Sequence, residues 1–302
     1  MLTSYLLRRL LHAVLLLAGI SVLTFLLLEI APGDFLGEAK LNTQLSPSTI
    51  AALRERYGLN QSLPHKYVRW LGSVADGSFG VSFAYDLPVS TLLWPRARKT
   101  LQITLVSLVL AWLIALPLGI WTAARRGGWV DRIFGTATSL LLALPDLVLA
   151  CLALFVAVRM GWYHSGRSAL PVTVLVLAAL PALLRHVRSA VRAVTEQPYV
   201  RAARSFGISG ARFWFRWLLP AAANPLTSLF GLSIAGLLSS SLLVETILGW
   251  PGLGPLLLEA IAARDFYLVI GPVMLSALFL IAGVLVSDLL LYVLDPRIRV
   301  SS

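Results

Sequence analysis

The residues best suited to chemistry gather in one stretch between two apolar blocks, from Arg185 to Ala223. Within it a tyrosine, two arginines, paired alanines and a glycine follow each other closely. They are Tyr199, Arg201, Ala202, Ala203, Arg204 and Gly207, with Leu219 and Pro220 further on. Small side chains let a partner's surface approach a helix closely, so the stretch is typical of a binding element. The same pattern suits an ordinary helix hairpin at a membrane surface.

Local signals predict a helix, a corner and a second helix in this stretch. Pro198 sets the φ angle of a first helical turn, and Gly207 can take the left-handed conformation that ends a helix. Ser209 can cap a second helix that runs to Leu219, where Pro220 bounds it. The two helices would therefore project from the membrane on a basic stalk.

Motifs for catalysis or metal binding are missing from the sequence. None of the lysines, Lys40, Lys66 and Lys99, follows a glycine, so the phosphate-binding loop of many ATPases is absent. The four histidines lie far apart, without cysteine or carboxylate partners at ligand spacing. We therefore expect no catalytic, cofactor-binding or metal-binding residue in this chain.

The composition excludes an ordinary soluble protein. Of the 302 residues, 58% are hydrophobic and only 13% are charged, with a mean hydropathy of +0.83, whereas soluble domains carry about 25% charged residues. The net charge is +11, but the basic residues lie between apolar blocks, as in loops on the cytoplasmic side of a membrane. This arrangement predicts contact with membrane lipid and no binding of nucleic acid.

The apolar pattern predicts an all-α polytopic membrane protein with six transmembrane helices, since a bilayer core needs about 20 apolar residues per helix. The fourth block is short and is expected to continue through Val187 or beyond. Pro117, Pro145 and Pro181 mark expected kinks. The blocks are Leu10–Ile30, Leu101–Trp121, Ile133–Val158, Leu170–Leu184, Pro225–Leu248 and Leu268–Leu294.

The basic loops place both termini in the cytoplasm. The long segment between the first two blocks then lies outside, as a small extracytoplasmic domain. It is expected to hold one helix from Ser46 to Gly58 and an amphipathic stretch over His65–Leu71. This domain could contact an outer partner or cap the helix bundle. The expected organisation is a first spanning helix over 1–31, the outer domain over 32–99, and a core over 100–302 with a cytoplasmic loop over 185–223.

Three acidic residues fall inside apolar blocks. Asp146 follows Pro145, Glu245 lies near the outer end of the fifth block, and Asp288 lies within the sixth. An ionisable group in hydrocarbon costs about 2.5–3.5 kcal/mol on insertion scales, so each should face protein or water. They are candidates to line a translocation path, or to act as structural partners of a backbone break or an arginine.

Several motifs in order resemble the ABC importer permeases of the dipeptide/oligopeptide/nickel branch. The spacing of Ala202-Ala203, Gly207 and Leu219-Pro220 is similar to that family's coupling motif, and 199–204 resembles its Y-V-R-x-A-R form. Further similar stretches are Ala31–Asp34, Tyr57–Gln61, Val244–Ile247, Trp250–Gly254, Ala263–Tyr267, Asp288–Leu290 and Leu294–Arg299. The long segment after the first helix resembles the first permease of a pair.

This resemblance implies the type I importer permease fold and a non-catalytic subunit of an ATP-driven importer. It implies a second homologous permease, two ATPase subunits that bind the ATP, an extracytoplasmic substrate-binding protein, and a location in a bacterial inner membrane. Cargo would be di- or oligopeptides or related small solutes, nickel included. The residues named between Tyr199 and Pro220 would couple to the ATPases. The alternatives are a self-sufficient secondary transporter, which would need inverted repeats and an ion site, and a non-transporting scaffold.

Overall fold

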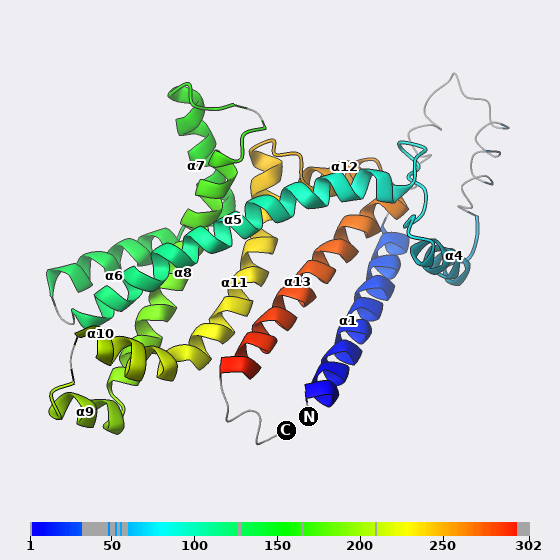
Figure 1. Cartoon of the computed structure of the whole chain (residues 1–302). Coiled ribbons are helices and arrows are strands. Elements are labelled where there is room, and N and C mark those ends of the chain that lie inside the picture. The colour runs from blue at the N-terminus through cyan, green and yellow to red at the C-terminus, as the bar shows by residue number, and fades with distance from the viewer. Residues whose placement is uncertain are drawn as a thin grey trace. The chain divides into compact units, whose positions relative to one another are not determined.

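The computed structural model is mainly helical in the part of the chain that it describes, which comprises residues 2–31, 48, 52, 55, 60–125, 128–164, 166–208 and 210–294. One isolated antiparallel bridge joins Val81 and Pro88 in these ranges. The helices, shown in Figure 1, are α1 (Leu2–Ile30), α4 (Leu63–Ala75), α5 (Val89–Ala124), α6 (Trp129–Leu142), α7 (Asp146–Arg159), α8 (Ala169–Thr195), α9 (Pro198–Ser205), α10 (Gly210–Phe213), the π-helix η1 (Trp214–Leu218), α11 (Leu219–Ile247), α12 (Leu253–Ala262) and α13 (Phe266–Leu294).

Five of the described helices are long and apolar enough to cross a membrane: α1, α5, α8, α11 and α13. A sixth span forms if α6 and α7 are counted together, although their axes differ by 96°. The six-helix, all-α prediction is confirmed in this form. Each of these five helices contains an apolar stretch with a mean hydropathy between 1.7 and 2.6. Such stretches are more stable in lipid than in water.

The expectation of one helix over Ile133–Val158 is wrong. Helix α6 ends at Leu142, and α7 begins at Asp146 with Pro145 as its N-cap, at φ −59° and ψ 144°. Proline lacks an N–H and disfavours the helical conformation of the residue before it, so the chain leaves the helix around Leu144. The kink expected at Pro145 is therefore a full break between two helices.

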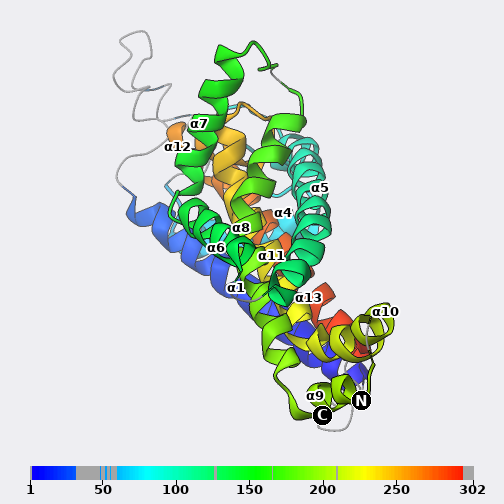
Figure 2. The same cartoon turned by 90° about the vertical axis from the view of Figure 1, so that its left-hand side faces the viewer.

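One compact unit of the chain comprises Met1–Leu7, Leu101–Trp250 and Leu280–Ser302. Its centre is the pair α8 and α11, which lie side by side in both views (Figures 1 and 2) and are packed against each other, with α6 and α7 also contacting this pair. The buried core includes Leu175, Val187, Val191, Leu218 and Leu237. Helix α8 runs to Thr195, which confirms that the fourth block continues past Val187.

The second compact unit comprises Arg8–Thr100 and Pro251–Phe279. Within it Phe25 of α1 contacts Tyr67 and Trp70 of α4 and Phe266 of α13, with ring centroids 4.9–5.3 Å apart. The buried carboxylate of Asp265 holds the chain that precedes α5. It accepts hydrogen bonds from Ser82 Oγ at 2.6 Å and from the N–H of Ala84 at 2.9 Å. This unit thus joins the end of α1 to the start of α13.

Several helices begin or end at residues other than those predicted from the sequence. Helix α4 covers and extends the predicted stretch His65–Leu71. Helix α5 begins at Val89, well before the apolar block at Leu101. The helix expected from Ser46 to Gly58 lies outside the described residues. The division into 1–31, 32–99 and 100–302 stays a prediction.

Candidate functional site

Helix α9 has the start and the end that the sequence predicts. Gln197 is extended at φ −65° and ψ 140°, and Pro198 opens the first turn. Gly207 takes φ +80° after the last turn, and its N–H donates to the carbonyl of Arg204 at 2.9 Å. The N–H of Ile208 donates to the carbonyl of Ala203 at 3.2 Å. These two bonds close the helix C-terminus through a left-handed glycine, so the predicted corner is confirmed.

Beyond the corner the chain departs from the prediction that Pro220 bounds the second helix. Helix α10 passes into the π-helix Trp214–Leu218 and then directly into α11. Pro220 lies in the first turn of α11, directly after the π-helix, so the helical run continues past a residue that has no N–H to donate. The wide π turn before it changes the course of the helix without ending it. Ser209, the expected cap, lies outside the described residues.

The two alanines of α9 differ in exposure to solvent. Ala203 is 3% exposed and lies beside the buried Val200, while Ala202 is exposed. The sequence alone predicts that the two alanines share one patch of small side chains, and this prediction is wrong. Helical spacing explains the difference, because Ala203 and Val200 are three residues apart and share the inner face. Only Ala202 is available to a partner.

Large apolar side chains flank Ala202 on the outer face of α9. Tyr199 is 49% exposed and Phe206 is 85% exposed. The three residues are separated by three and four positions, so they lie along one side of the helix. Sequence reasoning named Tyr199 but missed Phe206, although an aromatic residue directly before the corner glycine was a readable signal. We call Tyr199, Ala202 and Phe206 the α9 outer face.

Basic residues border this surface. Arg201 and Arg204 are exposed, and the guanidinium of Arg204 lies 4.7 Å from the ring centroid of Phe213. That cation–π contact holds α9 against the start of the next helix. The predicted coupling residues of α9 thus lie close together, with Ala203 on the inner side. Of Leu219, only its place at the start of α11 is described.

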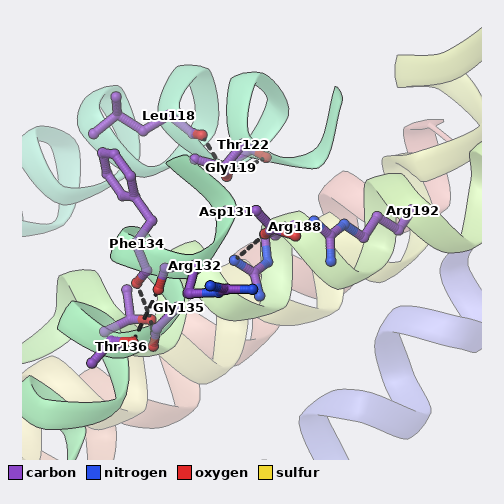
Figure 3. A network of polar contacts seen from close by, with 11 residues as sticks. Leu118, Gly119, Thr122, Asp131, Arg132, Phe134, Gly135, Thr136, Arg188 and Arg192 are labelled. Atoms are coloured by element: carbon purple, nitrogen blue, oxygen red, sulfur yellow. Dashed lines mark hydrogen bonds and ion pairs between the residues drawn. The ribbon is translucent and has the colours of Figure 1, made fainter. Parts of the chain in front are cut away.

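An ion-pair network supports the stem of α9, and the sequence did not reveal it. Asp131 of α6 lies 2.9 Å from Arg188 and 2.8 Å from Arg192, both on α8 and both measured to Oδ1 (Figure 3). The three side chains are largely buried, between 18% and 25% exposed. Charge-assisted hydrogen bonds in such partly dry surroundings hold helices in a fixed register. The network therefore ties α6 to the part of α8 that leads into α9.

Asp146 lies where the α6–α7 break meets α11. It is half-buried in the first turn of α7, and its carboxylate accepts a hydrogen bond from Ser240 Oγ. Ser240 also lines a cavity of about 240 Å³ between α8 and α11. Small and apolar residues form most of its wall, together with His186. Asp146 is thus one hydrogen bond away from this cavity.

The other two acidic candidates lie elsewhere. Glu245 is 0% exposed near the end of α11, and Asp288 is half-buried in α13. Neither is among the residues that line the α8–α11 cavity. The structure therefore brings one of the three acidic residues next to this cavity, and a path role for the other two stays a prediction.

Several apolar spanning helices together with a helix–corner–helix segment define a polytopic helical membrane protein. The chain matches the profile described as "Binding-protein-dependent transport system inner membrane component" over residues 115–300. Its N-terminal companion profile matches residues 1–104. The chain belongs to this family, the non-catalytic permeases of ABC importers, whose ATPase is a separate subunit.

Curated relatives match along nearly the whole chain. The oligopeptide transport system permease protein AppB of Bacillus subtilis (strain 168) is 32% identical over 98% of this chain and 99% of its own. The dipeptide transport system permease protein DppB of Lactococcus lactis subsp. cremoris is 30% identical with the same coverage. The nickel import system permease protein NikB of Staphylococcus aureus (strain USA300) is 30% identical over 96% of this chain and 90% of its own.

Solved structures of the MetNI methionine ABC transporter, in inward-facing conformations, share the fold. One aligns with a TM-score of 0.56 at 23% identity, covering 67% of this chain and 98% of the other. A second aligns with a TM-score of 0.60 at 20% identity, covering 69% and 98%. The type I importer permease fold is thereby confirmed.

Proposed function

We propose that this permease carries di- or oligopeptides or related small solutes, nickel complexes included, across a bacterial inner membrane. The relatives named for oligopeptides, dipeptides and nickel, each matched over most of its length, support this range. The chain works with a second homologous permease, two ATPase subunits and an extracytoplasmic binding protein. ATP binds to the ATPase subunits, and this chain holds no cofactor. Both termini lie in the cytoplasm.

The coupling role belongs to the segment from Tyr199 to Pro220. The observation that carries it is the α9 outer face, with a small alanine between two exposed aromatic side chains. A protein partner that covers Tyr199 and Phe206 would remove their apolar surface from water, while Ala202 lets its backbone approach closely. Gly207 fixes the angle between α9 and the helix that follows, so a push on α9 reaches α11.

The translocation path runs past Asp146 and the α8–α11 cavity. A carboxylate beside small, apolar walls can accept a hydrogen bond from a passing cargo without trapping it. The hydroxyl of Ser240 is the natural competitor for the same carboxylate, so the bond between them can open and close as cargo moves. Glu245 and Asp288 stay candidates for other parts of the path.

Uptake by purified components tests this function. The chain and its co-purified subunits would be placed in proteoliposomes, with binding protein outside and labelled peptide or nickel as cargo. We expect uptake only when ATP is inside and binding protein is outside. Uptake by the chain alone, without ATP, would assign it to the self-sufficient secondary transporters.

A further inference from the structure

Polar side chains are scarce in the wall of the α8–α11 cavity. Its volume of about 240 Å³ has room for a small solute rather than for one water molecule. The polar side chains in the wall are Ser233, Ser240 and His186. Ser233 Oγ accepts from the indole N–H of Trp112 at 2.9 Å and donates to a carbonyl of its own helix at 2.7 Å. Ser240 donates to Asp146, so both hydroxyls are already engaged within the chain.

The ring of His186 is oriented by its own helix. Its Nδ1 lies 2.7 Å from the carbonyl oxygen of Ala182, one turn earlier on α8. A carbonyl oxygen can only accept, so Nδ1 carries the proton of this hydrogen bond. In the neutral ring the other nitrogen, Nε2, then holds a lone pair. No described residue makes a hydrogen bond with Nε2, so the wall offers one acceptor that a solute can use.

His186 and Ser240 lie at opposite ends of the cavity. Helix α8 descends toward α9 and α11 rises on the far side of it, so the two helices run in opposite directions (Figure 1). His186 is the last lining residue on α8, and Ser240 is the last on α11. The lining stretch of α8, residues 178–186, is roughly 12 Å long. An extended tripeptide spans roughly 10 Å, so a cargo of that size nearly reaches from one end to the other.

Both ends of the cavity present acceptors. Nε2 of His186 accepts at one end, and the carboxylate of Asp146, bonded to Ser240, accepts at the other. No lysine or arginine is among the described residues that line the wall. A peptide carries the matching donors, its α-ammonium group and its amide N–H groups. An imidazole can also ligate nickel, but the described residues contain no group of three His, Cys, Asp or Glu that could hold a bare metal ion. The cavity therefore suits a peptide better than a bare nickel ion.

We propose that His186 contacts the cargo, with Nε2 accepting a hydrogen bond from the α-ammonium group of a peptide in the α8–α11 cavity. This inference rests on the proposed function, in which the path runs past Asp146, and it adds a second contact at the end of the cavity nearer α9. An ammonium group between apolar walls is costly unless it finds an acceptor. The imidazole supplies that acceptor without a full negative charge, so it holds the peptide without trapping it.

Uptake of labelled trialanine by the purified complex tests the proposal, in proteoliposomes with ATP inside and peptide-saturated binding protein outside. His186→Leu removes the acceptor, whereas His186→Gln keeps one in its side-chain carbonyl. The uptake rate should fall about tenfold in His186→Leu, the effect of losing one hydrogen bond to a charged group. His186→Gln should retain most of the rate.

His164→Leu is the matched control. His164 is also exposed, and its Nδ1 lies 3.0 Å from the carbonyl oxygen of Trp162, but it does not line the cavity. This variant should take up trialanine at the parent rate. A loss as large as that of His186→Leu would show that the effect is not specific to the cavity, and it would overturn the proposal.

Four further results would overturn the proposal. Parent-like uptake by His186→Leu would do so directly. Equal losses in His186→Leu and His186→Gln would assign the side chain a role in shape rather than as an acceptor. Loss of the second permease from the purified His186→Leu complex would show that this subunit fills the cavity. Uptake of nickel but not of trialanine by the parent would exclude a peptide as the ligand. A parent that takes up neither cargo would instead refute the proposed function itself.

Discussion

Arg192 of α8 donates a hydrogen bond from Nη2 to Oδ1 of Asp131 on α6, at 2.8 Å. Arg188, one turn earlier on α8, reaches the same oxygen at 2.9 Å. Two cations thus share one carboxylate. This contact links α6 to α8, although α7 lies between these two helices in the sequence. The link lies on the stretch of α8 that runs into α9. The ion pairs therefore hold α6 against the end of α8 that leads into α9.

Removal of this carboxylate should loosen the link. Asp131→Asn removes the charge of the carboxylate that Arg188 and Arg192 share. We expect a loss of about 1.5–3 kcal/mol in unfolding free energy, as for a hydrogen bond to a charged group. Unfolding of the purified complex by titration with sodium dodecyl sulfate measures it. Arg185→Gln, an exposed neighbour on α8, is the control and should unfold like the parent. Parent-like unfolding of Asp131→Asn would contradict the account.

Any side chain added at Gly207 should lower the stability of the corner. Its φ is +80°, and a Cβ there would have no atom within 4 Å, so the cost is conformational only. We expect Gly207→Ala to lose about 1–2 kcal/mol and Gly207→Val to lose more. Both should bend α9 away from its position and uncouple ATP hydrolysis from uptake. Parallel assays of both activities measure this. Gly19→Ala, in the apolar part of α1, should leave both activities intact.

Ala202 and Ala203 should respond differently to a large side chain. Ala202→Trp adds bulk on the exposed side of α9, so the chain should reach the membrane in normal amounts and yet fail to transport. Ala203→Trp adds bulk at a buried position and should cost about 1–3 kcal/mol through overpacking. Quantitative blotting of membranes together with uptake separates the two outcomes. Normal uptake by Ala202→Trp would show that α9 is not part of the docking surface.

Asp146 should act on cargo more than on folding. Asp146→Asn keeps an acceptor for Ser240 but removes the charge, whereas Ser240→Ala removes the donor. If the carboxylate contacts cargo, Asp146→Asn should raise KM for uptake about tenfold, the effect of losing one charge-assisted hydrogen bond. Ser240→Ala removes the hydroxyl that competes with cargo for this carboxylate, so its KM should equal the parent value or fall below it. Equal destabilisation of both variants with unchanged KM would assign the pair a structural role.

Much of the fold could be predicted because its signals are local. Apolar length predicted the spanning helices, and Pro198 with Gly207 predicted α9 and its corner. The break at Pro145 was expected only as a kink, because a proline inside a long apolar run permits either outcome. Pro220 misled the prediction, since the same residue both ends helices and begins them.

The site was less accessible to sequence reasoning, because it depends on which side of each helix is covered. No local sequence signal indicates that Ala203 is buried while Ala202 is exposed. The pairing of Asp131 with Arg188 and Arg192 depends on the packing of α6 against α8. Likewise the bond between Asp146 and Ser240 joins residues far apart in the sequence, and only the tertiary fold brings them together.

Cross-linking from the α9 outer face tests the central claim most directly. Cys151 is the only cysteine, so Cys151→Ala gives a background without thiols. Into it a single cysteine is placed at Ala202, or at Trp162 as a control in the outer loop. With a short thiol cross-linker and a cysteine-bearing ATPase subunit, Ala202→Cys should give a covalent adduct whose yield changes on addition of ATP. An adduct from Trp162→Cys and none from Ala202→Cys would contradict the assignment.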